Sequence, residues 1–471
     1  MTIYARLGLL AVALAPACDW GGQYCEGDWA AMSPEQEPAT PQARVVAQIL
    51  PTQTNAVDIL FVIDDSKSMT DEQEQLGIWS NELFDVLGSS GELPDLHIAV
   101  TSSSVAIPGL TQCDSRGGQF HVGKASLQEG DFIRDGVGPN GRVRNYTGAL
   151  TDTFAKMARV GDGGCGFEQP FKAARLALST PGKFLRADAL LLVVFVTDED
   201  DCSATDGGLL FTEPYSDACS DLGTLTSYRC FEHGVRCYDG KGSRAFGDRE
   251  NCHPDETSAY VESVAKFADY LKALKRNPAQ VVVAGIYGKP NHVSTVPDEK
   301  ITSYTQPRLA NVCGTGGFEG TGATPAIRMN ALLAKFGGRA SQSSICDSEL
   351  SWAMRDVGLV TRDAATRSRC LRGALLDIDA ATAGVQPACR VVVARDVGTR
   401  LDKQTELPPC TGSQTTRCYT IDKEAACAAT DTRLAVRVDD QAVDETLTVS
   451  CDVDLDAAPL HPSVGELRTD E

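Results

Sequence analysis

Two nearly continuous apolar runs, each followed at once by acidic residues, constrain the fold of this 471-residue chain more than any other feature. They span residues 57–63 (VDILFVI) and 189–197 (ALLLVVFVT). Runs of this kind, rich in β-branched residues, are typical of strands that are buried on both faces of a parallel sheet. Helical patterns separate and follow them, so the sequence predicts an α/β fold with a doubly wound, mostly parallel sheet.

Strands and helices alternate through the central part of the chain. The first strand is followed by a helical pattern with Leu76, Trp79 and Leu83 on one face. The further expected elements are strands at 96–101, 189–197 and 280–286 and helices at 149–158, 169–178, 260–274, 325–336 and 349–360. Ligand sites in such sheets lie at the carboxyl ends of the strands, which is where the acidic clusters 64–65 and 198–201 stand.

Hydroxyl and carboxyl residues occur at both strand ends in a recognisable pattern. The motif Asp64-x-Ser66-x-Ser68 after the first strand, with Thr197-Asp198 at the end of the later one, resembles a von Willebrand factor type A domain over roughly residues 57–360. The resemblance implies a metal-ion-dependent adhesion site, and these hard oxygen ligands suit Mg²⁺ or Ca²⁺. The alternative is that Asp64 and the two serines only cap the helix that follows.

The middle ligand departs from the family pattern. The resemblance implies a Thr just before the helix at 169–178, and alignment of that helix places Glu168 there, in a GCGFEQP segment. Asp65 also stands where the family usually has Gly. With Asp64, Glu168 and Asp198 all ionised, the site together with its divalent cation would carry one net negative charge. This charge would repel a partner's carboxylate. We therefore expect a partly structural cation and weakened carboxylate-dependent adhesion. Alternatively, Glu168 only satisfies the dipole of that helix.

The N-terminus and the 17 cysteines point to export. Residues 1–17 predict a signal peptide, with Cys18 directly after a small-residue cleavage site. This arrangement resembles a bacterial lipobox, which implies that Cys18 is lipidated and that an even 16 cysteines remain for disulfides. The alternative is ordinary cleavage with Cys18 as a half-cystine. Residues 18–56 are Pro-rich and predict a tether without a core of its own.

Two cysteine-rich regions lack helical or strand periodicity over much of their length. We expect a vWA-like domain at 57–365 with an insertion at 202–256 that is stapled or disordered, and a disulfide-stapled β module with an acidic tail at 366–471. The module could serve recognition or only packing. Two weaker alternatives for the insertion are a second calcium loop at 198–206 and a zinc site. The residues considered for zinc are Cys230, His233, Cys237, Cys252 and His253.

Charge and motifs exclude several functions. The net charge is -21, from 64 Asp+Glu against 43 Lys+Arg, so the surface repels nucleic acid and favours cations or basic partners. The sequence contains no HExxH or GxSxG motif and no Cys–His signature, so we do not expect an enzyme. No stretch is long and apolar enough for a transmembrane helix, which leaves a lipid as the expected anchor to an outer or periplasm-facing membrane.

The features together favour an exported, lipid-anchored protein that binds a divalent cation. Its expected role is the recognition of a protein ligand of unknown identity at the bacterial cell envelope, through the vWA-like domain. The competing hypothesis is a structural envelope component in which the metal only stabilises the fold.

Overall fold

The computed structural model describes most of the chain between residues 44 and 452. Within these limits it omits residues 51–53, 90, 109–112, 180–181, 183, 213–219, 299–305, 314–321, 367, 372–374, 380, 383, 398–401, 411–416, 425–426, 428–432, 439–441 and 443–444. The signal peptide at 1–17 and the lipidation site Cys18 therefore lie outside the described residues.

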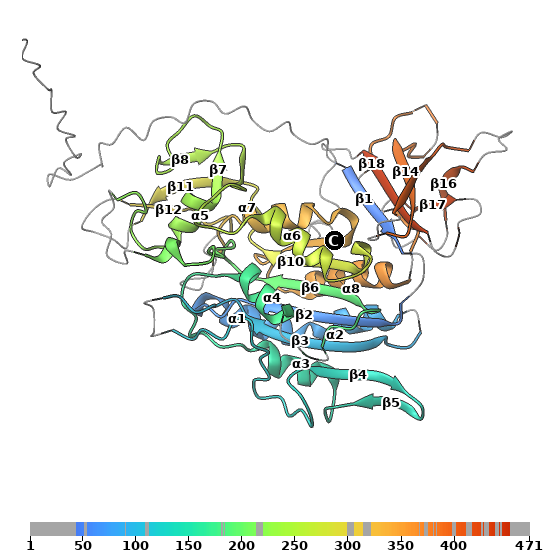
Figure 1. The fold of residues 1–471 in the computed structure, drawn as a ribbon, viewed down its shortest axis with the longest axis horizontal. Coiled ribbons are helices and arrows are strands. Elements are labelled where there is room, and N and C mark those ends of the chain that lie inside the picture. The colour runs from blue at the N-terminus through green and yellow to red at the C-terminus, as the bar shows by residue number, and fades with distance from the viewer. Residues whose placement is uncertain are drawn as a thin grey trace, which may run out of the picture.

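A seven-stranded sheet forms the centre of the molecule, with the strand order β13-β10-β6-β2-β3-β4-β5 (Figure 1). The strands are β2 (Ala56–Ile63), β3 (Asp95–Ser102), β4 (Ile133–Gly138), β5 (Gly141–Arg144), β6 (Leu190–Val196), β10 (Val281–Tyr287) and β13 (Ala340–Ser344). The first five strands of that order are parallel, whereas β4 and β5 add an antiparallel hairpin at one edge. Ile63 pairs with both Val196 and Ser102, so the segments after β2, β3 and β6 begin side by side.

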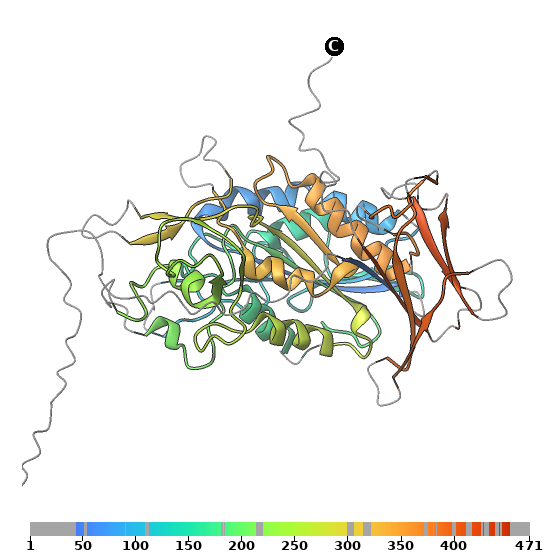
Figure 2. The ribbon, with the colours of Figure 1, turned by 90° about the horizontal axis from the view of Figure 1, so that it is seen from above.

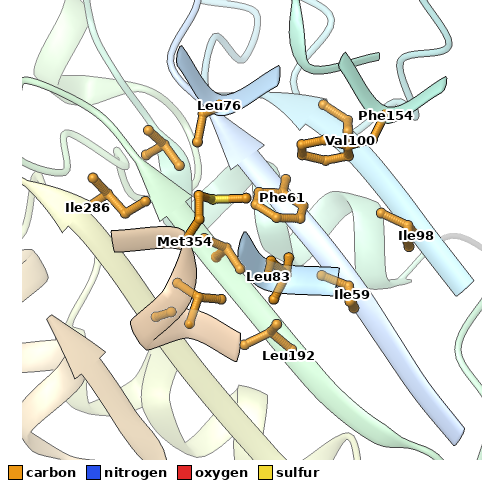
Figure 3. Close-up of a cluster of buried hydrophobic side chains, with 14 of the residues drawn as sticks. Ile59, Phe61, Leu76, Leu83, Ile98, Val100, Phe154, Leu192, Ile286 and Met354 are labelled. Atoms are coloured by element: carbon orange, nitrogen blue, oxygen red, sulfur yellow. The ribbon is translucent and has the colours of Figure 1, made fainter. Parts of the chain in front are cut away.

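Both faces of the sheet are covered by helices, as the sequence predicts. One face carries α1 (Thr70–Ile78), α2 (Ser80–Gly88), α3 (Leu150–Ala158) and α8 (Ser351–Thr366), and the other carries α4 (Pro170–Ser179), α6 (Val264–Ala273) and α7 (Ile327–Ala334). Alternate residues of β2 point into the two hydrophobic cores, one on each face of the sheet. Phe61 packs near Phe154 and Met354 on the first face (Figure 3). Leu60 and Val62 pack on the second face. The doubly wound α/β fold is confirmed.

Two helix boundaries differ from the prediction. The helix expected through Trp79 is two helices, because α1 ends before this residue and α2 begins after it. The Trp79 indole N–H donates back to the Gln75 side chain at 2.7 Å, while Leu76 and Leu83 remain buried on the predicted face. The helix expected from residue 260 begins at Val264, because the Ser263 side chain accepts the Lys266 backbone N–H and caps it there.

The C-terminal region forms the predicted β module. A four-stranded antiparallel sheet has the order β1-β18-β14-β15, and β16 and β17 pair beside it. The strands are β1 (Arg44–Ile49), β14 (Cys389–Arg395), β15 (Lys403–Leu407), β16 (Tyr419–Lys423), β17 (Leu434–Val438) and β18 (Thr446–Asp452). Three disulfides staple it: Cys370–Cys427, Cys389–Cys451 and Cys410–Cys418.

One predicted domain boundary is wrong. The tether expected over residues 18–56 does not continue to the first strand, because β1 pairs with β18 over six residues and Ile49 is buried in the core of the β module. Figures 1 and 2 show β1, in blue, beside the red strands of the module. A chain segment before the α/β domain thus completes a sheet built by the segment after it.

Glu445 is expected to make the stability of the β module depend on pH. Its buried carboxylate accepts hydrogen bonds from Arg417 and Arg395 at 2.8 and 2.9 Å. The Arg417 hydrogen bonds, followed by those of Arg395, lower the pKa of Glu445 from 4.5 to about 2. Because the folded-state pKa is the lower one, the stabilisation is complete above about pH 4.5 and is lost as the pH falls toward 2.

Glu445→Gln should therefore lower the free energy of unfolding by about 2 kcal/mol at neutral pH and by much less near about pH 2, which urea unfolding at the two pH values measures. Glu406→Gln is the matched control, since the Glu406–Arg390 pair of the same module is more than half exposed on both sides and should contribute little. An equal loss at both pH values would contradict the electrostatic explanation.

The insertion is stapled and has structure of its own. It contains η2 (Leu209–Phe211), α5 (Tyr228–Gly234), β7 (Val235–Cys237), β8 (Gly247–Arg249) and β9 (Cys252–Pro254), and β8 joins a small sheet with β11 (Val293–Pro297) and β12 (Pro307–Leu309). Cys230, Cys237 and Cys252, the cysteines considered for zinc, form the disulfides Cys202–Cys230 and Cys237–Cys252. Because a disulfide leaves no thiolate to bind a metal, the zinc alternative is wrong. Figures 1 and 2 place the insertion and the β module at opposite ends of the central sheet.

Disulfides account for all the cysteines that the structure describes. Fourteen cysteines form seven bridges, and the two bridges not yet mentioned are Cys113–Cys165 and Cys313–Cys346. This number of disulfides indicates an oxidising, extracytoplasmic compartment. None of the helices in the described part has both the length and the apolar character needed to cross a membrane. The remaining short elements are η1 (Lys67–Met69), η3 (Pro278–Gln280) and η4 (Gly337–Arg339).

Candidate functional site

Asp64 lies at the centre of the carboxyl edge of the sheet. It directly follows β2, and its backbone N–H donates to the Val196 carbonyl of β6 at 2.9 Å. One carboxylate oxygen, Oδ1, accepts the Ser66 backbone N–H at 2.7 Å, and the other, Oδ2, accepts the Thr197 hydroxyl at 2.7 Å. The side chain is fully buried, so its orientation is fixed by the strand ends of β2 and β6.

Ser66 and Ser68 lie next to Asp64 in the loop that follows β2, and Asp198 follows Thr197 at the end of β6. The two serine hydroxyls are 3.0 Å apart and half-buried, and Ser68 is close enough to Asp198 to lower the pKa of its carboxyl group by hydrogen bonding. Neither η1 nor α1 receives a side-chain hydrogen bond at its N-cap. The geometry therefore does not support the alternative that these residues only cap the following helix.

Glu168 lies near Asp64, with carboxylate oxygens of the two residues within 4.8 Å of each other, and it is 1% exposed. Its Oε2 accepts the Ser103 hydroxyl, whereas Oε1 has no hydrogen-bond partner. The N-terminus of α4 is satisfied by other groups: Asp201 accepts the Phe171 backbone N–H at 3.1 Å, and Ser203 Oγ accepts that of Lys172 at 2.9 Å. The alternative that Glu168 serves only the helix dipole is thus not supported.

Asp65 lies in the same group of buried acids, although the sequence motif does not mark it as a ligand. It is 2% exposed, and Asp64, Asp65 and Glu168 each bring one carboxylate oxygen within 4.8 Å of the others. Gly164 permits this approach, since a Cβ there would lie 2.8 Å from the Asp65 carbonyl oxygen. The signal was present in the sequence, because Asp65 stands where the related family has a residue without a side chain.

Burial and mutual repulsion destabilise the charged forms of these four acids. Burial first, and then the charge of Asp198, raises the pKa of Asp64 to about 7. Burial first, and then Asp64, raises the pKa of Glu168 well above its ordinary value. Burial is also the main cause that raises the pKa values of Asp65 and Asp198. In the described part of the chain, none of the four forms an ion pair with Lys or Arg.

The donor set fits a hard divalent cation. It consists of carboxylates and hydroxyls only, and two of its buried oxygens, Glu168 Oε1 and Asp198 Oδ1, lack hydrogen-bond partners. A buried oxygen without a partner is rare, and a bound cation satisfies it. The residues predicted as ligands all lie in segments at this edge of the sheet, and their role as metal ligands stays a prediction: Asp64, Ser66, Ser68, Glu168 and Asp198.

The rest of the second acidic cluster has structural roles. Asp200 accepts the backbone N–H groups of Arg328 and Met329 at 2.9 and 3.0 Å, at the start of α7. Asp201 forms a buried ion pair with Arg328 at 2.8 Å. Because the carboxylates of Asp200 and Asp201 are committed to these contacts, the alternative of a second calcium loop at 198–206 is not supported.

Comparisons with known proteins give low overall similarity. No protein-family profile and no curated protein matches the chain. Among solved structures, a von Willebrand factor type A protein from Catenulispora acidiphila matches at 10% identity and a TM-score of 0.26, covering 88% of this chain and 62% of that one. The pilus adhesin SpaC from Lactobacillus rhamnosus GG, in its open conformation, matches at 11% identity and a TM-score of 0.30, covering 90% and 43%.

A third match is the pilus adhesin RrgA from Streptococcus pneumoniae, at 10% identity and a TM-score of 0.28, covering 86% of this chain and 57% of that one. The chain thus spans about 43 to 62% of the length of these structures. Such superpositions carry no argument about function.

The strand order, the helices on both faces and the acidic carboxyl edge define a von Willebrand factor type A-like α/β fold, as the sequence resemblance implied. This assignment rests on the chain's own topology and on the residues gathered at that edge.

Proposed function

We propose that this extracytoplasmic protein binds a divalent cation, Mg²⁺ or Ca²⁺, at the carboxyl edge of its sheet and recognises a protein ligand there, at the cell envelope. One observation carries the proposal: Asp64, Asp65 and Glu168 are buried with carboxylate oxygens within 4.8 Å of one another, and none of them pairs with a Lys or Arg of the described residues. Asp64, Glu168 and Asp198 would hold the cation together with the hydroxyls of Ser66 and Ser68. The cation would supply positive charge and fix the loops around it.

Two disulfides support a role in recognition. Cys113–Cys165 anchors the segment that leads to Glu168, and Cys202–Cys230 anchors the insertion directly after the acidic cluster. The Cys202 backbone N–H also donates to the Glu168 carbonyl at 2.7 Å, which joins the two segments. Loops held in this way lose little conformational entropy on binding.

The accessible part of the site is small. Lys67 is exposed and its neighbours Ser66 and Ser68 are half-buried, whereas the carboxylates are covered. A partner would therefore touch the loops around the cation more than the cation itself. The net charge of -21 favours a partner with a basic surface.

The competing proposal is a structural envelope component in which the cation only stabilises the fold. A binding experiment separates it from the recognition proposal, which predicts the following result. The purified full chain, immobilised with Ca²⁺ or Mg²⁺, should retain a specific protein from an envelope extract and release it on chelation. Asp402→Asn, which changes an exposed acid of the β module at the opposite end of the central sheet, should retain the same protein, and Asp198→Asn should not. Loss of thermal stability on chelation without any retained partner would favour the structural role. Mass spectrometry of the intact mature protein tests lipidation at Cys18 in the same preparation.

Glu168→Thr is expected to raise the affinity for a short carboxylate-containing peptide by roughly tenfold in the presence of Mg²⁺. The substitution removes one negative charge that would surround the cation, so an incoming carboxylate meets less repulsion. Fluorescence anisotropy of a labelled peptide measures the change. Glu168→Gln, which removes the charge but keeps the shape, should have a similar effect. Unchanged peptide binding that a chelator nevertheless abolishes would show that the charge argument is wrong.

A further inference from the structure

Arg339 is buried at the junction between the α/β domain and the β module. It belongs to η4, which follows α7 and precedes the edge strand β13 of the central sheet, and it is 2% exposed. Its Nη2 donates a hydrogen bond to the backbone carbonyl of Gln48 in β1. Because β1 is an outer strand of the module's sheet, this hydrogen bond joins the α/β domain to the module.

The rest of the Arg339 guanidinium lacks a partner. Its Nε and Nη1 are buried and donate to no acceptor. None of the acids in the described part of the chain pairs with it, and burial lowers its pKa to about 9. The side chain therefore stays charged at neutral pH without a counter-charge, which is unfavourable in a buried position.

The other buried arginines of the described residues are compensated. Arg328 pairs with Asp201 at 2.8 Å, and Arg249 pairs with Asp239 at 2.6 Å. Arg229 donates to a set of backbone carbonyl oxygens, those of Leu210, Thr212, Gly223 and Thr224. Arg339 differs from all three, so its two unpartnered donors point to an acceptor that is not part of the chain.

The surroundings favour a small, singly charged anion. Gln48 is followed by Ile49 and Leu50, which are buried in the cores of the β module and of the α/β domain. Phe336, whose carbonyl accepts the Arg339 backbone N–H at 3.0 Å, is buried in the core on the other face of the central sheet. A phosphate or sulfate ion carries several oxygens that one guanidinium would leave largely unsatisfied in such a place, whereas a chloride ion needs few donors.

We propose that Arg339 binds a chloride ion at this junction. The ion would accept a hydrogen bond from the guanidinium and supply the missing counter-charge. It would thereby stabilise the contact between η4 and β1, and with it the attachment of the β module. The site is independent of the proposed cation site, because it lies before the start of β13, whereas the acidic residues lie after the ends of β2 and β6.

The test compares urea unfolding of the full chain in sodium chloride and in sodium gluconate at the same ionic strength. Sodium is the cation in both salts, so the acidic edge of the central sheet experiences the same conditions. Chloride at about ten times its dissociation constant should lower the unfolding equilibrium constant of the wild type about tenfold relative to gluconate. Arg339→Met should lose this difference. Arg390→Met, which changes an arginine of the β module that is 58% exposed, should keep it.

Two results would overturn the inference. One is a difference of the same size in all three proteins, which would be a general effect of the anion. The other is equal stability of the wild type in the two salts, which would mean that water satisfies Arg339. If Arg339→Met does not fold, wild-type crystals grown in sodium bromide replace it in the test. An anomalous-scattering peak within hydrogen-bond distance of the guanidinium then supports the inference, and the absence of that peak overturns it.

Discussion

Asp201→Ala is expected to lower the free energy of unfolding by about 3–5 kcal/mol, because it leaves the Arg328 guanidinium buried without its counter-charge. Arg328 is 1% exposed and donates to the Asp201 carboxylate at 2.8 Å. It also donates to the carbonyl oxygens of Gly234 and Glu262, so the pair ties the acidic segment to the insertion and to the start of α6. Asp201 additionally accepts the Phe171 backbone N–H at the start of α4.

Urea unfolding followed by circular dichroism measures this loss. Asp206→Ala is the matched control, since Asp206 is an exposed acid five positions along the same segment and should change stability by less than about 0.5 kcal/mol. Asp201→Asn keeps an acceptor for the Phe171 N–H but removes the charge, so it should still lose most of the stability. A loss below about 1 kcal/mol for Asp201→Ala would show that Arg328 finds another partner.

The central sheet and its acidic edge could be predicted because their signals are local. An apolar run such as that of β2 contains its own evidence of burial on two faces, and parallel strands bring their carboxyl ends to one edge whatever lies between them. Asp64 and Asp198 are 134 positions apart in the chain, yet two strand ends sufficed to place them together. The position of Glu168 at this edge could be predicted only by aligning the helix at 169–178 with the pattern of the family that the sequence resembles.

The features that sequence reasoning missed depend on contacts between distant segments. β1 pairs with β18 across about 400 residues, and no local periodicity in residues 44–49 distinguishes a strand from an extended tether. Asp200 and Asp201 cannot be distinguished from Asp198 by sequence alone. Their roles become clear only from the position of Arg328, whose backbone N–H donates to Asp200 and whose side chain pairs with Asp201. Asp65 was noted as a departure from the family, but its role depends on how closely Gly164 lets the neighbouring loop approach.

Addition of Ca²⁺ or Mg²⁺ to chelator-treated protein is expected to raise the free energy of unfolding by about 3–4 kcal/mol at a hundred- to thousandfold excess of cation over its dissociation constant. The physical reason is that Asp64, Asp65, Glu168 and Asp198 are buried together, so without a cation they must either repel one another or take up protons. A cation removes both costs and satisfies the two oxygens without partners. Thermal and urea unfolding with and without cation measure the difference.

The double variant Asp64→Asn/Asp198→Asn separates a specific site from a general effect of salt. It removes two of the repelling charges, so in the presence of chelator it should be at least as stable as the wild type, but it should gain little from the cation. The wild type in NaCl of the same ionic strength controls for screening. If the double variant gains as much from Ca²⁺ as the wild type does, the stabilisation comes from elsewhere on this acidic surface. The four carboxyl groups would then be neutralised by protonation and not by a metal ion, and the proposal of a functional site at the carboxyl edge of the sheet would be wrong.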